Sequence, residues 1–189
     1  LDPDSMPVTL LRDGEGKAVT VTVGLPGHRQ LNARIWVANV GRVPLLMLDS
    51  DVESNGAAER DVTDRLYGGN SEHRLQQEML LGIGGVRAVR AYCALTGHAA
   101  PEVFHTNEGH AGFLAIERIR EHVLDGMSFE SAIEAVRAGG LFTTHTPVPA
   151  GIDRYTSELM ARYFEPYCEE FGCSFEHLMA LGHDDEVPD

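Results

Sequence analysis

Lysine is almost missing from this sequence of 189 residues, in which Lys17 is the only one. Basic side chains as a group are also few, because 15 lysines and arginines stand against 29 aspartates and glutamates, giving a formal net charge of −14. A field of that sign repels phosphate backbones, so we expect no nucleic-acid partner. The lack of lysine also argues against any cofactor held as an aldimine, since that bond needs a lysine in the cofactor pocket.

Cysteine and long apolar runs are scarce as well. The three cysteines, Cys93, Cys168 and Cys173, are odd in number and have no C-x-x-C spacing. This pattern is typical of reduced thiols and not of a disulfide framework or a zinc site. No apolar run approaches the length of a membrane span, and residues 1–7 do not resemble a signal peptide. We therefore expect a cytoplasmic protein without membrane contact.

The chain begins at Leu1 instead of methionine and ends in an acidic tail. We therefore expect an excised piece of a longer protein. Its length suffices for one core or two small ones, and no long linker separates two parts. We expect a single partial domain over residues 1–189, in which a β-rich section, 1–60, precedes an α/β section, 61–189.

The β-rich section contains four runs of β-branched and other apolar residues, separated by turn residues. The alternation V-T-V-T-V at 19–23 predicts a strand with one solvated face. Trp36 is expected to anchor the core beneath the sheet. The predicted strands are Val8–Leu11, Ala18–Val23, Asn32–Val40 and Val43–Leu48.

A helix is predicted to begin with Ser71 as its N-cap, because apolar residues recur at helical spacing beyond it. Gly82, Gly84 and Gly85 are expected to interrupt this helix and to allow the close approach of a neighbouring backbone. The G-I-G-G run is not a dinucleotide fingerprint, since the third glycine of G-x-G-x-x-G is missing and no strand precedes it. We therefore expect no nucleotide site.

Polar residues follow the predicted strand Glu102–Thr106. Asn107, Glu108 and His110 come directly after it, and apolar residues in 113–123 then recur at helical spacing. Asn107 is predicted to be the N-cap of that helix, with Glu108 in its first turn at the positive end of the helix dipole. One interpretation of these residues is therefore structural, as the cap of a helix.

A second junction of the same kind follows along the chain. Gly140–Thr144 is predicted to be a short strand that opens into His145, and a helix capped by Ser128, Ser128–Ala138, precedes it. The order strand, helix, helix, strand favours a parallel crossover. In one parallel sheet His110 and His145 would emerge at the same carboxyl edge, where α/β proteins bind their ligands.

A metal site is the alternative chemistry for these side chains, which include Glu108, His110 and His145 together with His105. No H-E-x-x-H or comparable ligand pair is present, so we expect no metal. A metal-dependent hydrolase built on His110, His145 and Glu108 is kept as an alternative.

The C-terminal segment indicates packing helices and no reactive constellation. A helix over Tyr155–Phe171 is expected to break near Pro166, and a short capped helix is expected over Ser174–Leu181. His177 and His183 are interpreted as exposed bystanders.

Three segments carry a resemblance to a known family. They read R-L-Y-G-G-N-S-E-H-R-L-Q-Q-E-M-L-L-G-I-G-G-V-R-A at 65–88, H-T-N-E-G-H-A-G-F-L-A-I-E-R-I-R at 105–120 and F-T-T-H-T-P-V-P-A-G-I-D at 142–153. In order and spacing the chain resembles the bacterial α-glucan (glycogen and maltodextrin) phosphorylases over residues 34–181.

The resemblance implies an α/β fold, as part of the N-terminal Rossmann-like lobe of a two-lobed glycosyltransferase-B enzyme. That family transfers a glucosyl unit from an α-1,4-glucan to phosphate, giving glucose 1-phosphate. Its pyridoxal phosphate sits in the C-terminal lobe. The implied partners of this chain are therefore that lobe and the glucan substrate, maltodextrin. Whether the parent is a homodimer or an allosteric enzyme is left open. We expect the chain to be a fragment of such an enzyme that is inactive by itself. The alternative is a non-catalytic carbohydrate-binding or scaffold module.

The resemblance also implies roles for individual positions. His145 resembles the family histidine that contacts the glucosyl unit, and the residues around it are implied to line the same cleft. Longer family members read N-D-T-H and T-N-H-T where this chain has N-E-G-H and T-T-H-T. The implied sugar-binding residues are Asn107, Glu108, His110, Thr144 and His145, and the implied gate-loop residues are Tyr67, Gly68, Gly69 and Asn70, with Arg74 beyond them.

Overall fold

The computed structural model describes residues 5–65, 69–107, 112–146, 148 and 153–182. It divides the chain into two compact units, Leu1–Glu102 and Val103–Asp189. The sequence suggested sections that divide near residue 60; the units divide later because a long helix packs onto the first sheet. That the two units belong to one domain stays a prediction.

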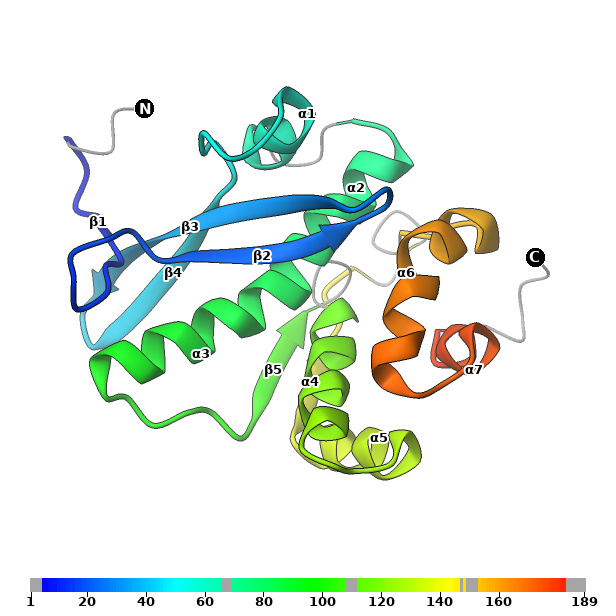
Figure 1. Ribbon diagram of the computed structural model, residues 1–189. Helices are drawn as coiled ribbons and strands as arrows, with labels where there is room; N and C mark the ends of the chain where they lie inside the picture. The colour runs from blue at the N-terminus through cyan, green and yellow to red at the C-terminus, as the bar shows by residue number, and fades with distance from the viewer. Residues whose placement is uncertain (1–4, 66–68, 108–111, 147, 149–152, 183–189) are drawn as a thin grey trace. The chain divides into compact units, whose positions relative to one another are not determined.

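The first unit is built on an antiparallel sheet of four strands, which correspond to the four predicted strands. Its long strand β3 (Arg29–Val40) pairs with β1 (Thr9–Leu10), β2 (Thr20–Leu25) and β4 (Val43–Asp49). Figure 1 shows the continuous helix of α2 (Ser71–Met79) and α3 (Gly85–Thr96) running across this sheet.

The two faces of β3 differ in burial. Leu31, Ala33, Ile35 and Val37 alternate along the buried face, whereas Trp36 lies on the other face and is half-buried. There the indole Nε1 of Trp36 donates to Oδ2 of Asp49 at 3.0 Å. The expectation that Trp36 anchors the core was wrong, because the period of two places its side chain opposite that of Ile35.

A single amide closes the sheet where β4 ends. Oδ1 of Asn55 accepts from the backbone N–H of Asn32 at 3.0 Å, and its Nδ2 donates to the carbonyl of Asn32 at 2.7 Å and to that of Ser50 at 2.8 Å. The buried Asn55 side chain thus continues the ladder of β3 and positions the short elements α1 (Ala57–Arg60) and η2 (Asp61–Thr63) that follow.

The predicted helix is continuous from α2 (Ser71–Met79) through a π-helical turn, η3 (Leu80–Gly84), to α3 (Gly85–Thr96). Its N-cap is Asn70 and not Ser71, since Oδ1 of Asn70 accepts from the N–H of His73 at 2.9 Å. Gly82, Gly84 and Gly85 lie within this continuous helix, so the expectation that they interrupt it was wrong.

Gly84 has a packing role that differs from the expected one. A Cβ at this position would lie 3.5 Å from Cδ1 of Leu48 and 3.6 Å from Cγ2 of Val23. The glycine therefore lets side chains of the sheet, and not a neighbouring backbone, come close to the helix. We infer that the π-helical turn fits this close packing.

By length and composition alone, the helix Ser71–Thr96 could cross a membrane. The expectation that no apolar run reaches that length was therefore wrong by this measure. Core helices of globular units pass the same test, and this helix buries Leu75, Met79, Ile83 and Val86.

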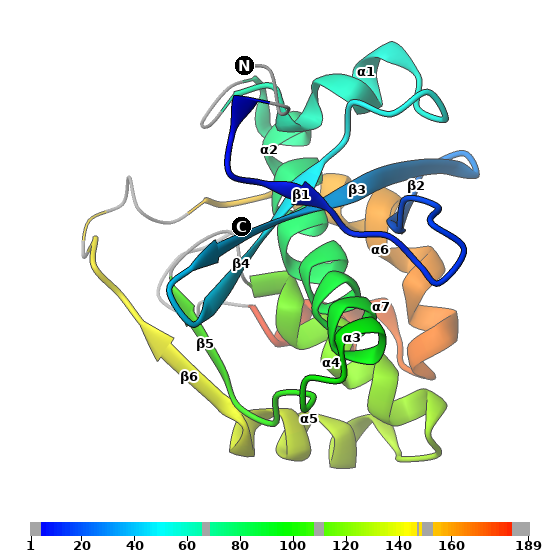
Figure 2. The same cartoon turned by 90° about the vertical axis from the view of Figure 1, so that its left-hand side faces the viewer.

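The second unit contains the predicted parallel crossover. β5 (Phe104–Asn107) and β6 (Gly140–Thr143) pair in parallel, and α4 (Gly112–Leu124) and α5 (Phe129–Ala138) connect them. Figure 2 shows the two strands side by side. Ser128 caps α5 as predicted. The parallel strands and the two helices between them confirm an α/β arrangement in this unit.

Two local predictions in this unit were wrong. Asn107 belongs to β5 and is not a helix cap, because it pairs with Thr143 in the parallel ladder. Helix α6 (Ser157–Phe171) continues through Pro166. We infer that Pro166 is tolerated because it is exposed, while neighbours such as Tyr163 and Tyr167 are buried and hold the helix in place.

The helices of the second unit pack through aromatic rings and a buried cation. Phe113 of α4 stacks on Phe164 of α6 with ring centroids 4.9 Å apart. The buried guanidinium of Arg118 lies 4.4 Å from the ring centroid of Phe104 and donates to the carbonyl of Val136 at 3.2 Å. The predicted short helix α7 (Phe175–Ala180), capped by Ser174, completes the unit.

Candidate functional site

The carboxyl edge of β5 and β6 is the first candidate site. Asn107 and Thr143 are partners at the end of the parallel ladder, and Thr144 and His145 follow as exposed residues. Parallel pairing therefore brings a carboxamide, two hydroxyls and an imidazole to one edge of the sheet. These groups offer both donors and acceptors to a ligand.

His105 has a local partner on the neighbouring strand. Its Nε2 lies 2.7 Å from Oγ1 of Thr143, which orients this exposed imidazole along the sheet. Sequence reasoning did not foresee this contact, because it depends on the register that places His105 opposite Leu141, two residues before Thr143.

The structure tests the premise of the predicted convergence of His110 and His145, and not the convergence itself. The two strands lie in one sheet and run parallel, as that hypothesis requires. Glu108 and His110 lie outside the described residues, so their convergence with His145 stays a prediction.

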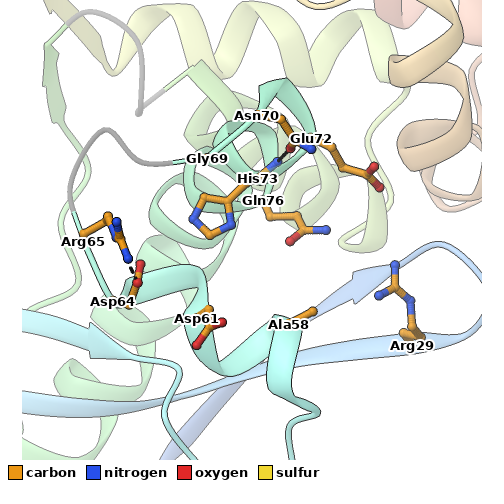
Figure 3. Close-up of a pocket in the computed structure, with 10 residues that line it drawn as sticks. All are labelled: Arg29, Ala58, Asp61, Asp64, Arg65, Gly69, Asn70, Glu72, His73 and Gln76. Carbon is orange, nitrogen blue, oxygen red and sulfur yellow. Dashed lines mark hydrogen bonds and ion pairs between the residues drawn. The ribbon is translucent and has the colours of Figure 1, made fainter.

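The second candidate site is a polar cavity of about 600 Å³ in the first unit, shown in Figure 3. Side chains from the start of α2 face those of α1 and η2 across the hollow. Gly69 and Asn70 of the implied gate loop belong to its lining, whereas Tyr67 and Gly68 lie outside the described residues. The lining residues are Arg29, Ala58, Asp61, Asp64, Arg65, Gly69, Asn70, Glu72, His73 and Gln76.

Charged side chains of both signs surround this cavity. Nε of Arg65 lies 3.1 Å from Oδ2 of Asp64, and NH1 of Arg29 lies 2.7 Å from Oε1 of Glu59. Carboxylate and guanidinium groups therefore both lie along the cavity. A lining with charges of both signs suits a neutral, hydrogen-bonding ligand better than an ion.

Arg74 does not line this cavity. Its NH2 lies 3.7 Å from Oε1 of Glu78, one helical turn further on, and both side chains are largely buried. The implied role of Arg74 next to the gate loop therefore stays a prediction.

Gln77 is a residue that sequence reasoning missed. Its Nε2 donates to the carbonyl oxygens of Val62 at 2.9 Å and Arg65 at 3.0 Å, and it lies 3.3 Å from Nε2 of His73. Gln77 thereby ties η2 and the residues just after it to α2, while the cap by Asn70 fixes the chain where the helix begins. Its only sequence signal was a polar position one turn after His73.

The described residues do not fit a pyridoxal phosphate site. Lys17 is exposed in the turn before β2, where its backbone N–H donates to Oδ1 of Asp13 at 2.9 Å. The lining of the cavity contains no lysine. Within the described part of the chain, no group of three or more His, Cys, Asp or Glu side chains could hold a metal ion.

Comparisons with known proteins give a consistent picture. No family model matches the chain. The chain is 54% identical to the glycogen phosphorylase of Mycobacterium tuberculosis, over 98% of its own length and 22% of that protein. It is 37% identical to the maltodextrin phosphorylase of Thermococcus litoralis, over 97% of the chain and 21% of that protein.

A third relative is more distant. Identity to the glycogen phosphorylase of Aquifex aeolicus is 31%, over 97% of the chain and 26% of that protein. Across the three relatives, the chain spans about a quarter or less of their length.

Proposed function

Because the chain belongs to the bacterial α-glucan phosphorylase family, as a segment of it, we propose that it supplies part of the sugar-binding side of a phosphorylase cleft. The reaction of the parent would be glucosyl transfer from an α-1,4-glucan to phosphate, giving glucose 1-phosphate. The proposal includes a C-terminal lobe as partner and a cytoplasmic location.

The observation that carries the proposal is the carboxyl edge of the parallel pair β5 and β6. A sugar needs closely spaced hydrogen-bonding groups, and an imidazole provides both a donor and an acceptor. Thr144 and His145 stand at that edge, beside Asn107. We assign to His145 the contact with the glucosyl unit, and we include Glu108 and His110 in the same surface.

The exposure of the β5–β6 pair supports a place in a larger lobe. Leu141 is 55% exposed and Phe142 is 62% exposed, and successive strand residues point to opposite faces. Parallel sheets normally have both faces covered, and two strands alone are marginal. Further strands and helices of the parent would cover these residues, as the Rossmann-like lobe of a glycosyltransferase-B fold requires.

We assign the gate of the cleft to the loop that contains Tyr67, Gly68, Gly69 and Asn70. Gly69 and Asn70 already line a polar cavity, and Gln77 fixes the chain just before this loop. Arg74 would support the loop from α2.

We propose that the 189-residue chain is inactive by itself. Pyridoxal phosphate supplies acid–base help through its phosphate when it is bound in the parent, and the described residues here provide no lysine pocket for it. General acid–base help contributes about 10²–10⁴-fold to a rate, and positioning by a second lobe adds to it. Maltodextrin, phosphate and pyridoxal phosphate together should therefore yield no glucose 1-phosphate.

Binding of maltoheptaose, followed by NMR titration of the chain, tests the proposal. We expect a dissociation constant on the order of millimolar, about 4 kcal/mol of binding free energy. His145→Ala should weaken binding by about tenfold, since it removes about one good hydrogen bond. The matched control is His177→Ala, because His177 is exposed on α7. Equal effects of the two variants, or steady turnover by the chain, would contradict the proposal.

A further inference from the structure

Two cysteines lie together where helix α6 ends. Gly172 follows the helix with a φ of 64°, a left-handed conformation that glycine adopts readily. This reversal brings the backbone N–H of Cys173 to 3.2 Å from the carbonyl oxygen of Cys168. Both cysteines are therefore held side by side by the helix cap itself.

The pair is reduced and differs in access to solvent. Both thiols are free; Cys168 is buried among the core side chains of the unit, whereas Cys173 is half-buried. A disulfide needs Cα atoms roughly 4.4–6.8 Å apart, and the backbone hydrogen bond across this turn holds the two residues close to that spacing. The backbone spacing across this turn is therefore compatible with a disulfide.

We propose that Cys168 and Cys173 form a reversible disulfide, so that the turn between α6 and α7 is a site of redox modification. The oxidant is a small disulfide such as oxidised glutathione. The thiolate of Cys173 attacks one glutathione sulfur, forms a mixed disulfide and releases the other glutathione as a thiolate. The thiolate of Cys168 then displaces the second glutathione, so two protein thiols become one disulfide and one glutathione disulfide becomes two thiols.

The surroundings determine how readily this pair reacts. Burial, together with the neighbouring Cys168 and Glu130, raises the pKa of Cys173 to about 11. Burial also raises the pKa of Cys168. Since only the thiolate attacks, and its fraction rises about tenfold per pH unit below the pKa, oxidation should accelerate steeply with pH.

The modification would act on the start of α7. Ser174 caps that helix by accepting from the N–H of His177 at 3.2 Å, and Ser174 directly follows Cys173. A bond from Cys173 to the buried end of α6 would therefore restrain the cap and slow the local opening of the turn.

The test is treatment of the folded chain with oxidised glutathione, followed by intact mass and peptide mapping. We expect loss of two hydrogens, one peptide linked through Cys168 and Cys173, and full reversal by dithiothreitol. The linked form should exceed the glutathione adduct by about ten times, because the second step is intramolecular. Its rate should rise about tenfold between pH 7 and pH 8.

Two variants serve as controls. Cys93→Ser removes the third thiol, which lies in the other unit, and should leave the linked product unchanged. Cys168→Ser should convert the product to a stable glutathione adduct on Cys173. A wild-type chain that stays reduced, or that accumulates the adduct on Cys173, would overturn the proposal.

Discussion

Loss of the Gln77 amide should destabilise the first unit by an amount that its contacts define. Nε2 of Gln77 donates to two carbonyl oxygens, those of Val62 and Arg65. A hydrogen bond of this kind contributes about 1 kcal/mol net, so Gln77→Ala should cost about 1–2 kcal/mol. With a urea m-value of about 2 kcal/mol/M, the unfolding midpoint should fall by roughly 0.5–1 M.

The assay uses a probe that the sequence provides. Trp36 is the only tryptophan and lies in the same unit as Gln77, so its fluorescence reports the unfolding of that unit. Gln30→Ala, at an exposed position of β3, is the matched control and should leave the free energy of unfolding within about 0.5 kcal/mol of wild type.

A second variant separates the hydrogen bonds from mere side-chain volume. Gln77→Glu keeps the shape but directs a carboxylate at two carbonyl oxygens, so it should cost more than Gln77→Ala near neutral pH. The folded state then disfavours the ionised form. As the pH falls below the usual glutamate pKa, about 4.3, the penalty should therefore shrink to that of one lost hydrogen bond, about 1 kcal/mol, because a protonated carboxyl has only one donor. Equal midpoints for Gln77→Ala, Gln77→Glu and wild type would refute the assignment.

Three further predictions use the same fluorescence assay. Asn70→Ala should cost about 1 kcal/mol because it removes the helix cap, and Ser71→Ala should cost clearly less. Gly85→Ala should raise stability by about 0.5–1 kcal/mol because its Cβ would meet open space, whereas Gly84→Ala should give no gain, since its Cβ would lie 3.0 Å from a leucine side chain. Burial would raise the pKa of Asp49, but three hydrogen bonds outweigh it and lower the pKa. That stabilisation is present above the unfolded pKa and lost as the pH falls through the folded one, so Asp49→Asn should flatten the acid limb of urea midpoints against pH.

Local patterns predicted most of the elements in this chain. The V-T-V-T-V alternation, the Ser128 cap and the order strand, helix, helix, strand each depend on neighbours in sequence, and each is confirmed. Trp36 shows the limit of such patterns. Alternation predicts that one face of a strand is buried, but which face depends on where a helix packs.

The residues of the candidate sites were likewise only partly predictable from the sequence. Thr144 and His145 could be placed at a sheet edge from sequence, because strand order determines which ends meet. Gln77 could not be found, because its partners are 15 and 12 residues away along the chain. Contacts of that kind appear only when η2 has been packed against α2.

The Asn55 amide has a consequence for how this protein behaves at high concentration. Beyond the end of β4, the backbone of β3 would present an open edge, and open edges recruit strands of other molecules. The Asn55 side chain hydrogen-bonds both backbone polar groups of Asn32, so it blocks the addition of a strand from another molecule at this edge. Asn55→Ala should therefore raise light scattering during storage, in addition to any loss of stability, whereas unchanged scattering would contradict this blocking role.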